Sequence, residues 1–171
     1  MSRQSWSACG AGHADDNPGN ATVEGKRILR LLVVLVALGV AVPAYVRLAP
    51  SDPARWHVDP STAGDPGRTG VLRRVAVFGD PATALARFDR IAQAAGASVL
   101  AGSVAAGHIT YVARSRLIGF PDYITVQAEP GNPDCVTELV ILSRLRFGWS
   151  DSGVNGARLD RWFERLQPAQ E

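Results

Sequence analysis

Hydrophobic residues are concentrated in one run near the N-terminus, residues 28–46, before the pattern changes to short alternating stretches. The run has nineteen residues, and all of them except Arg30, Pro43 and Tyr45 are apolar or small. As an α-helix it would be about 28 Å long, which is enough to cross a bilayer core. Residues 1–27 are polar and have no apolar period, so the pattern predicts a disordered tail followed by one transmembrane helix.

Basic residues around this run indicate its orientation. Three of them lie at its N-terminal side and two follow it: Lys26, Arg27 and Arg30, then Arg47 and Arg55. This bias favours a cytoplasmic N-terminus and an exported C-terminal part, which in a bacterium means an inner-membrane anchor and a periplasmic domain. A cleaved signal peptide is the alternative, because residues 42–44 (Val-Pro-Ala) could serve as a small-residue cleavage site.

Residues 47–70 contain four prolines and three glycines, a composition that predicts a linker in extended and turn conformations. We expect Trp56 and Val58 within it to dock on the folded domain, because an exposed tryptophan beside a valine would form an unused apolar patch. The folded domain itself is predicted to span residues 71–167.

Alternating apolar and polar positions in that domain predict strands over residues 71–78, 98–104, 108–115, 123–128 and 136–147. Asp80 followed by Pro81 predicts the start of a helix that ends at Gly96. Its buried stripe is expected to contain Leu85, Phe88, Ile91, Ala92 and Ala95.

A second helix is predicted near the C-terminus. Asn155 is a suitable N-cap, and the apolar residues Leu159, Trp162, Phe163 and Leu166 then share one helical face. The resulting order β-α-β-β-β-β-α predicts an α+β fold, in which a single antiparallel sheet is covered by two helices.

Two segments carry a resemblance to a known family. They are Arg114-Ser-Arg-Leu-Ile-Gly-Phe-Pro-Asp-Tyr and Ser143-Arg-Leu-Arg-Phe-Gly-Trp-Ser-Asp-Ser-Gly-Val-Asn, the latter followed by a short helix. With them, residues 56–166 resemble the domain-of-unknown-function family numbered 1499, which is found in bacteria and in plastid-bearing eukaryotes. The resemblance implies a domain type and no particular activity.

Arginines are the main candidates for chemistry. Arg114 lies on one strand and Arg144 and Arg146 on another, and if both strands flank residues 123–128 the guanidinium groups converge near Asp122 and Asp151. A guanidinium keeps its charge and donates hydrogen bonds in a fixed fork, so these residues, with Asn155 beside them, form a candidate anion site. The alternative is a set of ion pairs that only fix the geometry of the loops.

The sequence lacks the residue spacing that other catalytic and metal-binding motifs require. The segment at Ser150 lacks the glycine that a hydrolase nucleophile elbow needs where Ser152 stands. A calcium loop starting at Asp151 would require an oxygen ligand where Trp162 stands. No Cys/His spacing suits zinc, so we expect neither a metal nor another cofactor.

The overall charge and the cysteines restrict the function further. Eighteen basic residues against sixteen acidic ones argue against a general nucleic-acid binder. Cys9 and Cys135 lie on opposite sides of the apolar run, which excludes a disulfide within the folded domain.

The sequence therefore predicts an envelope module without enzymatic activity, which binds a partner protein, a lipid head group or a small anion. The alternative is a hydrolase-like enzyme that uses Asp122 and Asp151 with the arginines as an anion site. An enzyme requires a concave pocket with a carboxylate of raised pKa. A binding module requires only an exposed basic or apolar patch.

Overall fold

The computed structural model describes residues 18–115, 118–131 and 136–166, with side chains from residue 23 onward. The chain forms two compact units, Met1–Ala41 and Val42–Glu171. Residues 1–17 of the predicted tail and both cysteines lie outside the described residues.

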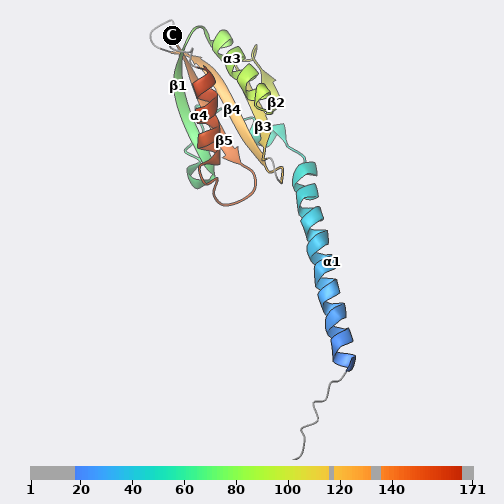
Figure 1. Cartoon of the computed structure of the whole chain (residues 1–171). Helices are drawn as coiled ribbons and strands as arrows, with labels where there is room; N and C mark the ends of the chain where they lie inside the picture. Colours follow the sequence, from blue (N-terminus) through green and yellow to red (C-terminus); the bar gives the residue numbers. More distant parts are fainter. Residues whose placement is uncertain (1–17, 116–117, 132–135, 167–171) are drawn as a thin grey trace, which may run out of the picture. The chain divides into compact units, whose positions relative to one another are not determined.

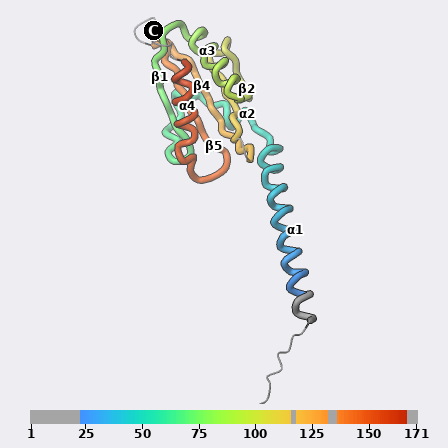
Figure 2. The backbone as a smooth tube through the Cα atoms, viewed as in Figure 1, coloured from blue at the N-terminus to red at the C-terminus, as the bar shows by residue number. Residues whose placement is uncertain are grey.

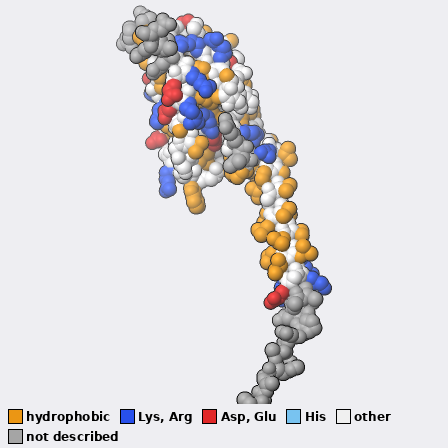
Figure 3. All heavy atoms as spheres, viewed as in Figure 1, with side chains coloured by type: hydrophobic (Ala, Val, Ile, Leu, Met, Phe, Trp, Pro, Cys, Tyr) orange, Lys and Arg blue, Asp and Glu red, His pale blue; other side chains and the backbone are white. Residues whose placement is uncertain are grey.

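The N-terminal helix α1 (Pro18–Leu48) begins earlier than predicted, because residues 18–27 form its first turns instead of a disordered tail. Its apolar part, Val23–Leu48, has 26 residues with a mean hydropathy of 2.3 and is long and apolar enough to cross a membrane. Hydrophobic side chains cover the visible face of this helix (Figure 3). A signal sequence can have the same length and composition, so the transmembrane anchor and the cleaved signal peptide both remain predictions.

Five antiparallel strands form one sheet in the order β1-β5-β4-β3-β2 (Figure 1). Their bounds are β1 Gly70–Phe78, β2 Ser98–Ser103, β3 His108–Arg114, β4 Pro121–Pro130 and β5 Val136–Leu145. Strands β2 to β5 follow one another as neighbours, and β1 pairs with β5 at the far edge. The predicted single sheet and element order are confirmed.

Helix α3 (Pro81–Ala94) begins as predicted, because the Asp80 carboxylate accepts a hydrogen bond from the Thr83 backbone N–H at 2.9 Å. Gly96 has a φ of +86°, a conformation that glycine adopts easily and that ends the helix. The buried residues of the helix are Ala84, Leu85, Phe88 and Ala92. Ala95 is exposed, contrary to prediction, because it follows the last helical turn.

Helix α4 (Val154–Leu166) lies beside α3 on the same face of the sheet (Figure 2). Leu159, Trp162 and Leu166 are buried as predicted, and the Trp162 ring meets the Phe88 ring edge-on with their centroids 5.6 Å apart. Asn155 is the second residue of the helix and not its N-cap. Its buried side chain points inward, so the predicted capping role is wrong.

The opposite face of the sheet is covered by residues 46–58, which we call the covering segment. It contains the last turn of α1 and the short helix α2 (Pro53–Trp56). Trp56 is only 7% exposed and stacks on Tyr123, with the ring centroids 3.9 Å apart and the planes 10° from parallel. The predicted docking of Trp56 is confirmed. Because this part of the predicted linker packs on the sheet, it belongs to the folded domain.

Candidate functional site

The residues of the predicted anion site lie on two different faces of the sheet. Arg144 pairs with Tyr123 and Arg114 pairs with Pro121, which places both arginines on the face of the covering segment. Asp122 pairs with Leu145 and, because successive strand residues alternate, its side chain lies on the helix face. The predicted convergence of the arginines near Asp122 is therefore wrong.

Backbone carbonyls of the covering segment accept hydrogen bonds from all three arginines. Arg144 Nη2 donates to the Trp56 carbonyl at 3.2 Å, and Arg146 Nη1 donates to the Pro50 carbonyl at 2.8 Å. Arg114 Nη1 donates to the carbonyls of Gly119 at 3.1 Å and Val46 at 3.4 Å. These contacts favour the open alternative that the arginines fix loop geometry, with carbonyls as their partners in place of carboxylates.

Trp56 contacts two arginine side chains through its ring. The guanidinium carbons of Arg55 and Arg144 lie 5.3 Å and 5.1 Å from its ring centroid, within the range of a cation–π interaction. Burial, and then the charge of Arg55, lower the pKa of Arg144. The Trp56 carbonyl also accepts a hydrogen bond from the Thr125 hydroxyl at 3.2 Å.

Two histidines make further contacts on the sheet face that the covering segment covers. His57 and His108 stack with their ring centroids 4.0 Å apart and their planes 17° from parallel. His57 Nδ1 lies 2.8 Å from the Thr110 hydroxyl, and His108 Nε2 lies 3.1 Å from the Val58 carbonyl. Burial, and then the nearby His57, lower the pKa of His108. These side chains join the covering segment to β3.

Asp122 and Asn155 meet on the helix face through Arg158, a residue that the sequence analysis missed. Arg158 Nη2 lies 2.7 Å from the Asp122 carboxylate, and its Nη1 donates to Asn155 Oδ1 at 2.6 Å. The Ser143 hydroxyl donates to the same oxygen at 2.8 Å. Burial raises the pKa of Asp122, while Arg158 acts in the opposite direction. The available sequence signal was the three-residue spacing of Asn155 and Arg158, which places them on one side of a helix.

Among the described residues, Asp151 directly contacts neither the arginines that bind the covering segment nor the Asp122–Arg158 network. Its carboxylate accepts a hydrogen bond from the Gly153 backbone N–H at 2.8 Å, and its own backbone N–H donates to the Arg68 carbonyl at 3.0 Å. The first bond closes a local turn, and the second ties the β5–α4 loop to the start of β1. Asp151 therefore shapes the loop.

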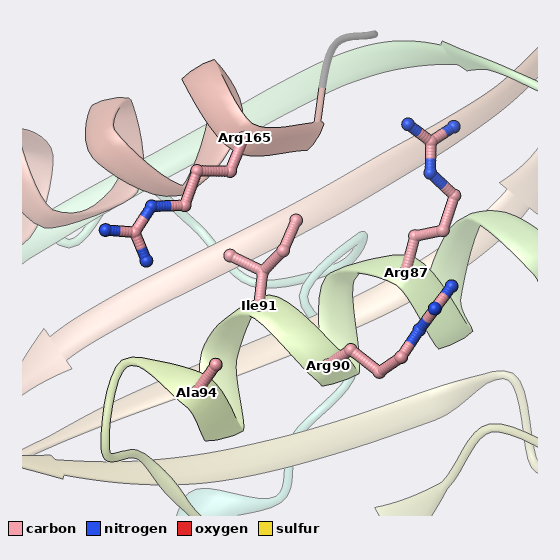
Figure 4. Close-up of a pocket in the computed structure, with 5 residues that line it drawn as sticks. All are labelled: Arg87, Arg90, Ile91, Ala94 and Arg165. Carbon is pink, nitrogen blue, oxygen red and sulfur yellow. The ribbon is translucent and has the colours of Figure 1, made fainter.

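An open groove of about 310 Å³ lies between α3 and α4, lined by Arg87, Arg90 and Arg165 around Ile91 and Ala94 (Figure 4). Arg87 donates to the Leu166 carbonyl, and Arg90 Nε donates to the Ala86 carbonyl at 3.4 Å. Arg165 makes no hydrogen bond or ion pair with the other described residues. The sequence analysis missed this groove because its arginines come from two helices far apart in the chain.

Basic side chains gather over α3 and α4 on the face shown in Figure 3. Within the described residues, no group of three histidine, cysteine, aspartate or glutamate side chains could hold a metal ion. The sites that the structure presents are thus a basic groove, an arginine-bound covering segment and a buried Asp122–Arg158 network.

An antiparallel sheet with two helices on one face and an N-terminal covering segment on the other defines a small α+β domain. The chain belongs to the family described as "Protein of unknown function (DUF1499)", whose model matches residues 48–166. A search of curated proteins found no match to the chain. The family match includes most of the covering segment, in agreement with its packing on the sheet.

Proposed function

We propose that the protein is a membrane-anchored binding module without enzymatic activity, and that the groove between α3 and α4 binds a phosphate-bearing ligand. The carrying observation is that Arg87, Arg90 and Arg165 all line one groove, together with the apolar Ile91 and Ala94 (Figure 4). Guanidinium groups donate paired hydrogen bonds that match the oxygens of a phosphate and remain charged at any physiological pH. The described residues that line the groove include no carboxylate that would compete with such a ligand.

The position of the carboxylates supports binding over catalysis. Asp122 has the raised pKa expected of an acid–base group, but it is held by Arg158 and is not among the residues that line the groove. Asp151 is engaged in a loop turn. A hydrolase-like reaction would require at least one of them beside the anion-binding arginines.

The apolar helix supports the membrane anchor. We place residues 1–27 in the cytoplasm and the folded domain in the periplasm of a bacterial cell, because the basic residues are more frequent on the N-terminal side of the span. An alkaline phosphatase fusion after Glu171 should be active, and a green fluorescent protein fusion there should be dark. The opposite pair of results would refute this orientation, and release of the domain from membranes would indicate a cleaved signal peptide.

Inorganic phosphate provides a direct test of the groove. The full chain in detergent should melt at a higher temperature as phosphate is titrated at constant ionic strength, because a ligand at 100 times its Kd stabilises by about 2.7 kcal/mol. Arg165→Ala should lose most of this phosphate-dependent shift. Arg161→Ala is the matched control, since Arg161 is exposed on the same helix and does not line the groove.

Two outcomes would refute the groove. One is a wild-type melting point that neither phosphate nor sulfate moves at any concentration. The other is an Arg165→Ala variant that responds to phosphate as strongly as the wild type and Arg161→Ala do. If the groove passes both tests, soluble glycerophosphates, compared with inorganic phosphate, will distinguish a lipid head group from a free anion.

A further inference from the structure

We infer that one end of the folded domain is a lipid-contacting surface, which seats the domain on the head-group layer of the bilayer crossed by α1. This inference rests on the proposed membrane anchor. The surface, here called the aromatic collar, consists of six side chains from three chain segments that meet where α1 ends: Tyr45, Leu48, Ile118, Phe120, Phe147 and Trp149.

Ring contacts join these segments. The Phe147 ring, just beyond β5, lies 6.3 Å from the Tyr45 ring of α1 and 6.1 Å from the Phe120 ring of the β3–β4 loop. The guanidinium carbon of Arg146 lies 5.1 Å from the Phe147 centroid. Tyr45, Phe120 and Phe147 therefore form one group of rings that joins the three segments, and Leu48, Ile118 and Trp149 follow or precede these rings by two or three residues in the chain.

The collar is exposed to an extent that a water-facing surface does not explain. Trp149 is 86% exposed, Leu48 81% and Tyr45 66%. Single exposed apolar residues are common, but a contiguous exposed group usually marks a contact surface.

Lipid is the occupant that the chain itself indicates. Tyr45 and Leu48 belong to the same helix as the apolar stretch and lie at the end of the candidate span, so a bilayer that holds this span also reaches these two side chains. Tyrosine and tryptophan are enriched at the boundary between hydrocarbon and head groups. Arg114 and Arg146 lie in the same region, and arginines there favour anionic head groups.

Two arginine side chains join the end of α1 to the rest of the folded domain. The Val46 carbonyl accepts from Arg114, and the Arg47 side chain lies so close over Gly119 that a Cβ there would be 2.8 Å from its Nε. The last turn of α1 and the domain thus form one packed unit.

Trp149 provides the reporter for a test in the full chain. The protein is reconstituted into vesicles of phosphatidylcholine and phosphatidylglycerol, and flotation on a density gradient first establishes whether it is anchored. The fluorescence of Trp149 is then obtained as the difference between the wild type and Trp149→Phe. We expect lipids with a spin label near the head group to quench this difference at least twofold more than lipids labelled deep in the acyl chain.

Phe78 offers a matched control position. It is 76% exposed, and it pairs with Val136 at the end of β5 opposite the Arg144 end. At about 3.4 Å per residue the two ends of this ladder are roughly 27 Å apart. In a Trp149→Phe background, a tryptophan introduced by Phe78→Trp should show no quenching by either labelled lipid.

The outcomes separate the collar from the anchor. The collar is supported if the protein floats and the head-group spin label strongly quenches Trp149 but not a tryptophan at position 78. Flotation without quenching of Trp149, or with equal quenching at position 78, overturns the collar and leaves the anchor intact. Failure to float overturns both. If Trp149 is protected from iodide but not quenched by lipid, a protein covers the surface, and the collar proposal is again wrong.

Discussion

Replacing Trp56 with alanine tests whether the covering segment is part of the folded domain. The side chain is 7% exposed, stacks on Tyr123 and lies under the guanidinium groups of Arg55 and Arg144. Its removal takes away one layer of this stack and leaves the buried Tyr123 ring without its neighbour. We therefore expect a loss typical of a core position, although Trp56 belongs to a proline-rich segment outside the sheet.

The expected magnitude follows from the buried surface. A buried tryptophan covers about 150–250 Å², which corresponds to roughly 4–6 kcal/mol at about 25 cal/mol per Å². The unfolded chain already buries some of this area, and measured tryptophan-to-alanine changes in cores cost about 3–5 kcal/mol. We expect Trp56→Ala to lower the free energy of unfolding by about 3–5 kcal/mol.

Urea unfolding of the full chain in mild detergent, followed by circular dichroism, measures this loss. The control is Trp149→Ala, whose side chain is 86% exposed and should change the free energy of unfolding by less than about 0.5 kcal/mol in these micelles. A loss below about 1 kcal/mol for Trp56→Ala would show that the covering segment contributes little to the fold.

Two other predictions concern the same face of the sheet. Arg144→Lys keeps the charge but loses the fork that reaches the Trp56 carbonyl, so the free energy of unfolding without ligand should fall by about 1.5–3 kcal/mol. Arg55→Lys is the control. If Arg144→Lys instead loses the response to phosphate and keeps its melting point, Arg144 belongs to an anion site. The folded-state pKa of His108 lies below its ordinary value of 6.5, so the unfolded chain binds the proton more readily and stability should fall as the pH is lowered through 6.5. A His108→Gln variant should have a smaller change in melting point between pH 7.5 and pH 5.5, and an equal change would contradict this prediction.

The alternation of apolar and polar residues was sufficient to predict the strands and their order, but not all their ends. Strand β4 extends to Pro121 and Pro130, because proline can occupy the terminal positions of a strand. Strand β5 ends at Leu145. The side chains of the following Arg146 and Phe147 contact the covering segment and Tyr45.

The start of α4 depended on a turn that residue preferences do not reveal. Asn155 is a favoured N-cap by composition, but Ser152 and Gly153 adopt positive φ values of 50° and 79°. This turn brings Val154 into the helix and directs the Asn155 side chain toward Ser143. The network with Arg158 and Asp122 follows from that inward orientation, which required knowledge of the tertiary contacts.

The second face of the sheet shows why the arginines were assigned to the wrong partners. Val112, Tyr123 and Leu142 show that this face must be buried, but alternation within strands does not indicate which segment covers it. The segment that does so is rich in proline and forms little regular structure, so its carbonyls have few backbone N–H partners. Buried carbonyls need donors from elsewhere, and Arg114, Arg144 and Arg146 supply them. When considered separately, the irregular segment suggested a linker docked through Trp56 and Val58, and the arginines suggested an anion site. In the folded domain, the arginines donate hydrogen bonds to the carbonyls of that segment.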